Sequence, residues 1–345
     1  MTLESLFDSL HRAGHLPSAT VPAIDLERDH SPWYTRVLLG GMGWLGGMLV
    51  LGFLGALISG LFDSAVGMSV LALMMFGASV AIYRAAPGND FATQFALAAS
   101  ICGQALAAVA FGKLVGHADD FTVVAWFIAL MQAALVWVMP NFLHRLISTI
   151  FAVAALLFAT KSGVMNVAVD LAMALGFVAL VHFESVLVAA GRRAICEPVL
   201  NGIAIGLLVT GIGYMSLVGG SSWFPHTGMS AVAFGIALLA WVWLSAKQLP
   251  ALSRGAALAA AIAFVAVSWR APGLLASALV LLASFAAGRR ALTALALVAM
   301  VAYLSAYYYQ MSMTLLAKSG VLALTGAVLL VLWWVQRQFF SKESS

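Results

Sequence analysis

The chain has 345 residues and a formal net charge of +4; 63% of its residues are hydrophobic, 9% are charged, and the mean hydropathy is +1.03. A soluble protein of this length cannot bury so much apolar surface, which excludes a soluble globular domain. The positive charge does not point to a nucleic-acid partner, because the basic residues of membrane proteins collect in the loops on one side. Continuous apolar runs without the alternation of barrel strands predict an all-α integral membrane protein in contact with lipid.

Residues 1–36 are predicted to be a cytoplasmic amphipathic segment. Apolar side chains recur there with helical spacing at Leu3, Leu6, Phe7 and Leu10. A short helix lying against the membrane bundle or a partner fits this pattern better than an independent domain. The membrane domain is expected over residues 37–336, and residues 337–345 form a short cytoplasmic tail.

Twelve apolar runs have the length of a membrane span, about 17–25 residues. They cover roughly residues 37–61, 64–83, 91–112, 121–139, 143–160, 164–187, 198–218, 229–246, 251–268, 271–287, 291–309 and 315–335. The fifth run is the weakest of the twelve, because it contains His144 and Arg145 near one end, and these side chains can reach the membrane surface only if that end lies at the interface.

The basic residues predict the orientation of the spans. With a cytoplasmic amino terminus, the cytoplasmic segments hold Arg12, Arg28, Arg36, Arg84, Arg145, Arg192, Arg193, Lys247, Arg254, Arg289, Arg290, Arg337 and Lys342. The other side holds Lys113, Lys161 and Arg270, with Lys318 at a span boundary. This asymmetry predicts that both termini are cytoplasmic.

Two short sequences occur twice. The sequence KSGV opens the sixth and the twelfth predicted spans, at residues 161–164 and 318–321, as an internal repeat of six plus six spans would require. The sequence AAGRRA, at residues 189–194 and 286–291, has a spacing that does not fit such a repeat. Duplication therefore stays open.

Small residues form ridges on two predicted spans. The glycines of these ridges are Gly43, Gly47, Gly52 and Gly60 on the first span and Gly202 and Gly206 on the seventh. Such ridges allow close helix packing, and a sliding contact in a transporter is the alternative interpretation.

The sixth predicted span carries three ionisable residues, Asp170, His182 and Glu184. Such residues inside a membrane commonly belong to ion or proton pathways. Asp170 and Glu184 would share one face of a continuous helix about 20 Å apart. The alternative is local neutralisation, of Asp170 by Lys318 and of Glu184 by the arginines at positions 192 and 193.

The remaining polar residues give no recognisable reactive site. Interhelical hydrogen bonds explain the amides Gln94, Gln104, Gln132 and Asn201. Cys102 and Cys196 have no disulfide or zinc spacing. We therefore expect no metal, no cofactor and no catalytic residues, and an enzyme that acts on lipid is the least favoured interpretation.

The eleventh predicted span ends in three consecutive tyrosines, Tyr307, Tyr308 and Tyr309, and Lys318 follows at the start of the twelfth. Tyrosine is favoured at the membrane surface because its ring is apolar and its hydroxyl polar. Three in a row cover nearly the whole circumference of a helix, so at least one should face protein.

Two stretches resemble a known family. The sequence YYYQMSMTLLAKSGVLALTGAVLL, which begins at Tyr307, and SPWYTRVLLGGMGWLGGMLVLGFLG, which begins at Ser31, are similar to the carboxy-terminal signature and the first membrane helix of the family called domain of unknown function 4401. The resemblance implies a multi-pass protein of the bacterial inner membrane, and no activity follows from it. It implies as a partner a membrane-anchored protein named for a GDYXXLXY motif.

Two hypotheses of function follow. The first is a non-enzymatic inner-membrane subunit of a small complex, whose periplasmic surface around the three tyrosines and Lys318 receives the partner. The second is a secondary transporter or channel for a small solute or ion, with Asp170, His182, Glu184 and Lys318 along its path. The oligomeric state stays open.

Overall fold

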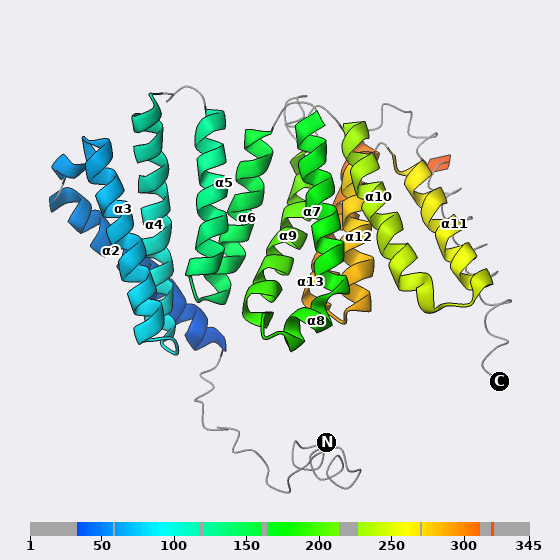
Figure 1. The fold of residues 1–345 in the computed structure, drawn as a ribbon, viewed down its shortest axis with the longest axis horizontal. Coiled ribbons are helices and arrows are strands. Elements are labelled where there is room, and N and C mark those ends of the chain that lie inside the picture. Colours follow the sequence, from blue (N-terminus) through cyan, green and yellow to red (C-terminus); the bar gives the residue numbers. More distant parts are fainter. Residues whose placement is uncertain are drawn as a thin grey trace, which may run out of the picture.

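The computed structural model describes residues 33–57, 59–116, 121–160, 164–213, 227–269, 271–310 and 319–320, and within these ranges it contains helices and no strands. The elements are numbered from α2, as in Figure 1. Their bounds are α2 (Trp33–Leu57), η1 (Ser59–Phe62), α3 (Ala65–Ala85), α4 (Asp90–Val115), α5 (Phe121–Val138), α6 (Phe142–Ala159), α7 (Val164–His182), α8 (Glu184–Ala189), α9 (Arg193–Gly213), α10 (Thr227–Ser245), η2 (Ala246–Gln248), α11 (Ala251–Val267), α12 (Pro272–Ala286) and α13 (Arg290–Gln310).

Seven of the described helices are long and apolar enough to cross a membrane: α3, α4, α5, α6, α7, α9 and α13. The chain is thus a multi-pass helical membrane protein by the length and composition of its helices. Shorter apolar segments lie in α2, α10, α11 and α12. Each of the first eleven predicted spans overlaps one of these helices, whereas the twelfth lies outside the described residues except for 319–320. The count of twelve stays a prediction, and residues 1–32 and 337–345 are outside the described part.

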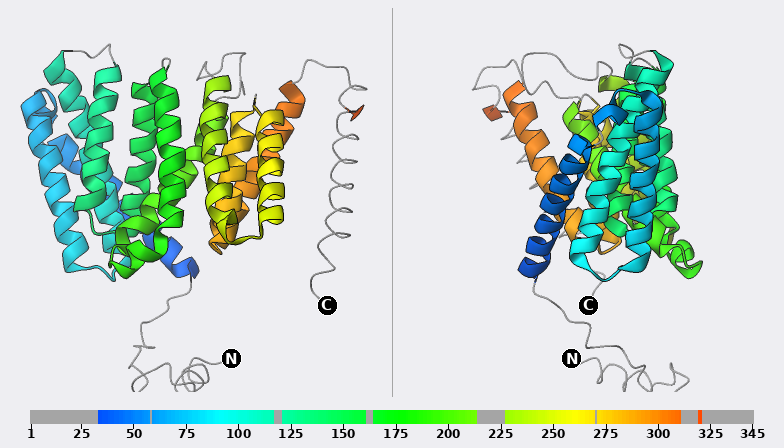
Figure 2. Two further views of the ribbon diagram at one scale, coloured as in Figure 1. Left: turned by 45° about the vertical axis from the view of Figure 1, so that its right-hand side comes forward. Right: turned by 90° about the vertical axis from the view of Figure 1, so that its left-hand side faces the viewer.

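The helices run side by side across a wide, flat bundle. Figure 1 shows α3, α4, α5, α6, α7, α10 and α11 in one row, with α9, α12 and α13 behind it. The two views in Figure 2 show α2 crossing the row at an angle on the same side as α13. Helix α9 packs against α6, α7 and α12, and so connects the amino-terminal helices to the rest.

The larger apolar core lies where α7, α9, α10 and α12 meet. Phe177, Leu200, Phe234 and Leu279 are fully buried there. Two residues of α6, Val153 and Leu157, complete the same cluster. Helix α9 therefore packs against α6 on one side and against α7 and α12 on the other. These contacts fix the position of the residues at its first turn.

One end of the bundle carries almost all described basic side chains, and we call it the basic end. It comprises Arg84, Arg145, Arg192, Arg193, Lys247, Arg254, Arg289 and Arg290, which lie at the turns that Figure 1 shows at the bottom. Lys113, whose ammonium donates to the Phe62 carbonyl, lies at the opposite end. The end predicted to be cytoplasmic is thus one continuous surface, while its orientation in a membrane stays a prediction.

The two AAGRRA sequences form the same turn at the basic end. Gly191 and Gly288 adopt φ values of 72° and 68°, which favour glycine. In each turn the N–H of the next arginine donates to a carbonyl five residues earlier, as in a Schellman motif. Helix ending therefore explains this repeated sequence locally, without duplication of a larger unit.

Glycines lie at two of the close helix crossings. A Cβ atom on Gly43 would lie 2.7 Å from the Phe91 carbonyl oxygen of α4, and one on Gly47 would lie 2.8 Å from Ala98 Cβ. Gly202 and Gly206 lie in the same way against Thr149 and Val153 of α6. Gly52 and Gly60 have no such neighbour within 4 Å among the described residues.

The sixth predicted span is not one continuous helix. Helix α7 ends at His182, Phe183 adopts a non-helical turn, and α8 begins at Glu184. The expectation that Asp170 and Glu184 share a face of one straight helix is therefore wrong, because the axis changes between them.

Candidate functional site

Five polar side chains form a cluster between α4, α5 and α6, which we call the histidine cluster. Ser100 and Gln104 come from α4, Gln132 from α5, and His144 and Ser148 from α6. All five are buried, and His144 is only 1% exposed. The His144 ring therefore points into the protein, where it contacts residues of the neighbouring helices.

The cluster is connected by hydrogen bonds from end to end. Gln132 Nε2 donates to Gln104 Oε1 at 2.8 Å, and Gln104 Nε2 donates to Ser100 Oγ at 3.3 Å. The imidazole continues the chain, because Ser100 Oγ lies 2.7 Å from His144 Nε2 and Ser148 Oγ lies 3.2 Å from His144 Nδ1.

One arrangement of protons satisfies all these contacts. Since Ser100 accepts from Gln104, its hydroxyl is available to donate to His144 Nε2. The Gln104 amide also lies 3.5 Å from this nitrogen, which favours Nε2 as the acceptor. The neutral imidazole then carries its proton on Nδ1 and donates to Ser148. All donors point from Gln132 toward Ser148, so the cluster is a directed chain of exchangeable protons.

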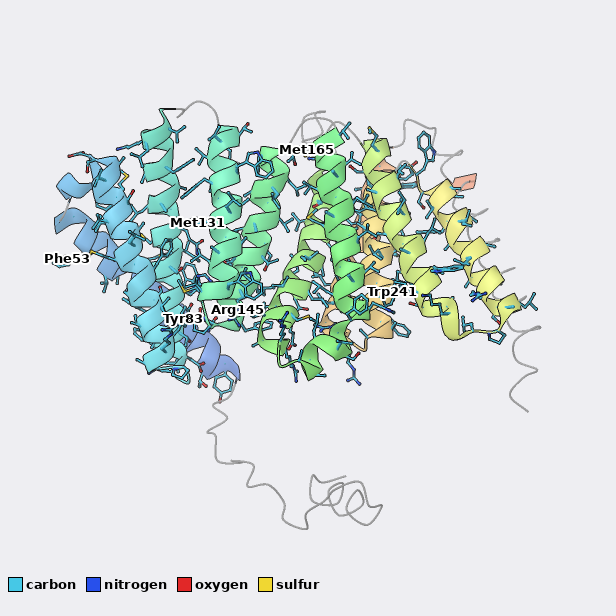
Figure 3. The ribbon with its side chains drawn as sticks, viewed as in Figure 1. Phe53, Tyr83, Met131, Arg145, Met165 and Trp241 are labelled. Atoms are coloured by element: carbon cyan, nitrogen blue, oxygen red, sulfur yellow. The ribbon has the colours of Figure 1, made fainter. Side chains whose placement is uncertain are left out.

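Tyr83 of α3 closes one side of the cluster. Its ring contacts His144 edge to face, with the ring centroids 6.1 Å apart. The Tyr83 hydroxyl is buried and has no hydrogen-bond partner among the residues that the structure describes. Figure 3 shows Tyr83 and the neighbouring Arg145 toward the same end of the bundle.

Arg145 connects three helices through backbone carbonyls. Its Nε donates to the Val136 carbonyl at 3.0 Å, in the last turn of α5, where a helix has no partner of its own. Its Nη1 donates at 2.8 Å to the Ala194 carbonyl of α9. Pro198 lies four residues after Ala194 and has no N–H to bond that carbonyl. The Arg145 side chain is thus buried and donates to two backbone carbonyls of neighbouring helices.

The three ionisable residues predicted in the sixth span are not brought together. Asp170 is 0% exposed within α7, whereas His182 is exposed at the end of that helix. Glu184 pairs with Arg289 at 2.5 Å, and Arg289 also donates to Asn201 at 3.2 Å. The structure thus places Glu184 in an ion pair at the basic end, with a different arginine from those considered in the sequence. Lys318 lies outside the described residues.

Tyr303 fixes α13 against the bundle one turn before the tyrosine triplet. Its hydroxyl donates to the Leu208 carbonyl of α9, and its ring is buried. The ring lies against Gly211 of α9 and Gly273 of α12, where an added Cβ atom would come within 2.8 Å of ring carbons. Only glycine leaves room for this ring, so the rotation of α13 about its axis is set here.

The three tyrosines end α13 at the side opposite the basic end. Tyr307 is 39% exposed and Tyr309 is 80% exposed. The Tyr308 ring contacts the Tyr309 ring edge to face at 5.6 Å. We call these three residues the tyrosine surface.

Comparison with protein families places the whole membrane domain in one group. Residues 32–338 match the family described as Domain of unknown function (DUF4401). The chain belongs to the DUF4401 family. The histidine cluster, Arg145 and the tyrosine surface all lie within the region that DUF4401 covers. No curated protein matches significantly, and neither does any solved structure. The resemblance seen in the first span and in the carboxy-terminal stretch is therefore confirmed for this DUF4401 chain.

The spacing of polar residues in the sequence indicates the histidine cluster. Ser100 and Gln104 are four residues apart, as are His144 and Ser148, so each pair lies on one helix face. The two amides had been expected to hydrogen-bond between helices, and they bond to each other. Within the described ranges no three His, Cys, Asp or Glu side chains gather as metal ligands would.

Proposed function

We propose that this protein is the membrane subunit of a small complex and has no chemistry of its own, with the tyrosine surface as the docking site for a partner on the outer side. The observation that carries this proposal is the exposure of Tyr309 and Tyr307 on different sides of a helix whose rotation Tyr303 fixes. The partner we expect is the membrane-anchored protein named for the GDYXXLXY motif.

The geometry of α13 argues against a purely lipid-facing role for these tyrosines. At about 100° per residue, Tyr307 lies about 40° from Tyr303, on the side that faces α9 and α12, and Tyr309 lies about 200° from Tyr307. One exposed side is enough for a tyrosine anchor at the membrane surface, so exposed tyrosines on nearly opposite sides of α13 favour a contact with protein. Exposed tyrosines are also frequent at the centres of protein interfaces.

Co-purification tests this proposal. The tagged chain is extracted from its native membranes in mild detergent, and retained proteins are identified by mass spectrometry. We expect the GDYXXLXY protein in near-stoichiometric amount. The double substitution Tyr307→Ala and Tyr309→Ala should weaken its binding about thirtyfold, as for an interface hot spot.

Phe121→Ala provides the matched control. Phe121 is an exposed aromatic residue at the same end of the bundle, at the start of α5, and its loss should leave partner recovery unchanged. Recovery of the chain without any such partner, or equal recovery with the double tyrosine variant, would contradict the proposal.

Transport of a proton or small solute is a second candidate, which the histidine cluster supports. A directed hydrogen-bonded chain with a buried imidazole is a plausible proton path. The substitution His144→Asn replaces the hydrogen bonds but cannot carry a proton at neutral pH. Proteoliposomes with an internal pH dye should then show proton entry under an imposed potential with the wild type and much less with His144→Asn. Equal rates for wild type, variant and empty liposomes would exclude this function.

A further inference from the structure

A groove of about 360 Å³ lies between α5 and α6 on one side and α7, α8 and α9 on the other. Its walls are almost entirely apolar and include Ala152 of α6, Leu180 of α7 and Val199 of α9. The volume falls within the range of about 300–1,000 Å³ that is usual for small-molecule sites. Trp137, which is 67% exposed, lies at the outer rim of the groove.

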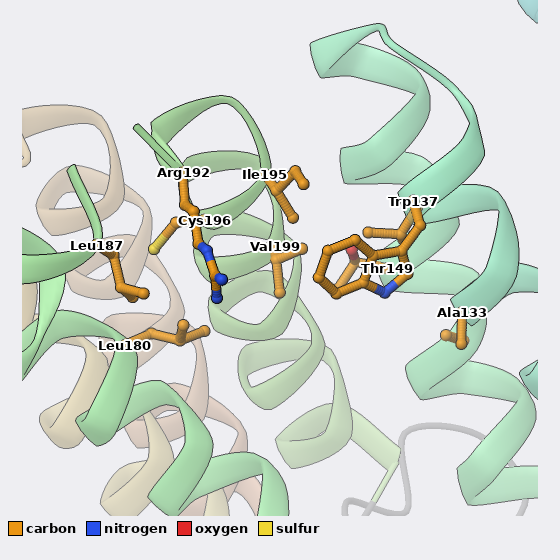
Figure 4. A pocket seen from close by; sticks show the side chains of 11 residues that line it. Ala133, Trp137, Thr149, Leu180, Leu187, Arg192, Ile195, Cys196 and Val199 are labelled. Carbon is orange, nitrogen blue, oxygen red and sulfur yellow. The ribbon is translucent and has the colours of Figure 1, made fainter. Parts of the chain in front are cut away.

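Among the described residues that line the groove, Arg192 is the one that carries a charge. Figure 4 shows its side chain extending past Cys196 into the space between Leu180 and Val199. Arg192 belongs to the basic end, where one surface of the membrane must lie. A phospholipid has an anionic headgroup and an acyl chain. A cation beside an apolar wall at the membrane surface is complementary to these two parts.

The neighbouring charges leave Arg192 available for such a headgroup. Glu197 pairs with Arg193 at 3.1 Å, and Glu184 pairs with Arg289 at 2.5 Å. In the part of the chain that the structure describes, Arg192 makes no ion pair and no side-chain hydrogen bond. The local balance is therefore one uncompensated positive charge at the mouth of an apolar groove.

We infer that this groove binds one acyl chain of an anionic phospholipid, with the phosphate at Arg192 and the chain against Leu180, Ala152 and Val199. Basic pockets between helices at a membrane surface bind anionic headgroups through the same electrostatic attraction. The site is separate from the tyrosine surface, which lies at the opposite end of the bundle.

Lipid retention by the purified full-length protein tests the inference. The protein is stripped of lipid in detergent, and native mass spectrometry then measures the binding of phosphatidylglycerol and of phosphatidylcholine with identical acyl chains. We expect one tightly held phosphatidylglycerol and about fivefold weaker binding of phosphatidylcholine, since one arginine at a membrane surface contributes about this factor.

Three variants locate the lipid. Arg192→Gln should abolish the preference for phosphatidylglycerol, and Arg192→Lys should retain it. Ala152→Phe fills the groove and should weaken the binding of both lipids. Arg290→Gln removes an exposed arginine of the same end, away from the groove, and should behave as the wild type.

Four results would overturn the inference. They are a wild type without headgroup preference, an equal loss of preference in Arg290→Gln, unchanged binding in Ala152→Phe, and a wild-type groove that retains no lipid because another part of the chain fills it. Size-exclusion profiles identify any variant that does not fold. If Arg192→Gln does not fold, the folded Arg192→Lys protein still tests whether a positive charge at position 192 keeps the headgroup preference.

Discussion

The Arg145 side chain of α6 connects this helix to α5 and α9. Replacing Arg145 by leucine removes the donor from the carbonyl of Val136, which is a buried residue, and from the carbonyl of Ala194, which is an exposed one. A buried carbonyl that is left unpaired costs about 1–3 kcal/mol, so Arg145→Leu should lower the free energy of unfolding by about this amount. Arg145→Lys should have an intermediate effect, because an ammonium cannot reproduce the planar fork. Thermal unfolding in detergent measures both.

The substitution Pro198→Ala provides a control for this prediction. Alanine restores an N–H that can bond the Ala194 carbonyl within α9. The double variant Arg145→Leu, Pro198→Ala should therefore be more stable than Arg145→Leu alone. Strict additivity of the two single effects would show that Arg145 and the proline do not act on the same carbonyl.

Substitutions of His144 should destabilise the protein to different degrees. His144→Leu removes the partner of both serines and should lower the free energy of unfolding by about 1–3 kcal/mol, the effect of leaving buried hydroxyls unpaired. His144→Asn should lose less, because its amide can still donate and accept. Equal stability of the leucine variant and the wild type, measured by thermal unfolding, would show that the cluster contributes nothing to folding.

Residue types could be read from the sequence, but their partners could not. The amides at 104 and 132 were expected to bond between helices, and they do so with each other. The burial of His144 and Arg145 could not be predicted, because a position near the end of a span does not tell which side of the helix faces protein. The carbonyl that Pro198 leaves unpaired provided a local signal for Arg145, yet the contact joins residues 49 positions apart.

At the scale of the helices, Gly202 should be sensitive to the smallest substitution. A Cβ atom there would lie 2.6 Å from Thr149 Cβ and 3.1 Å from the Leu146 carbonyl oxygen, so α6 and α9 must move apart. Gly202→Ala should destabilise the protein by about 1–3 kcal/mol, the usual effect of overpacking.

Gly52→Ala is the matched control in α2, because nothing among the described residues lies within 4 Å of the added Cβ. It should be neutral or slightly stabilising, since alanine favours the helix. The two variants are compared by melting temperature in the same detergent. A stabilising Gly202→Ala would contradict the close crossing.

Helix positions were predictable because apolar runs of span length are a strong signal, and eleven of the expected spans overlap described helices. The break at Phe183 was not predicted, since the apolar character continues through it from α7 into α8. A second ridge of small residues was expected at Gly52, Ala56 and Gly60, but neither of its glycines has a neighbour within 4 Å among the described residues, whereas Gly43 and Gly47 lie against α4. Sequence shows where small residues are, whereas the tilt of the helix decides which of them meet a neighbour.

At the scale of the whole molecule, the basic end predicts the orientation in the membrane. In a background of Cys102→Ala and Cys196→Ala, a cysteine at Arg290 should react with an impermeant maleimide only after the cells are opened. A cysteine at Lys113, at the opposite end, should react in intact cells once the outer membrane is permeabilised. The reverse labelling pattern would show the opposite orientation in the membrane and would place the tyrosine surface in the cytoplasm.

Docking of a partner on the tyrosine surface is the central claim, and photo-crosslinking from Tyr309 in native membranes tests it most directly. A photoreactive phenylalanine analogue replaces Tyr309, and the membranes are irradiated without detergent. We predict a single adduct that contains the membrane-anchored GDYXXLXY protein, and no such adduct from the same analogue at Phe121. Adducts with lipid alone, or with a second copy of this chain alone, would contradict the account.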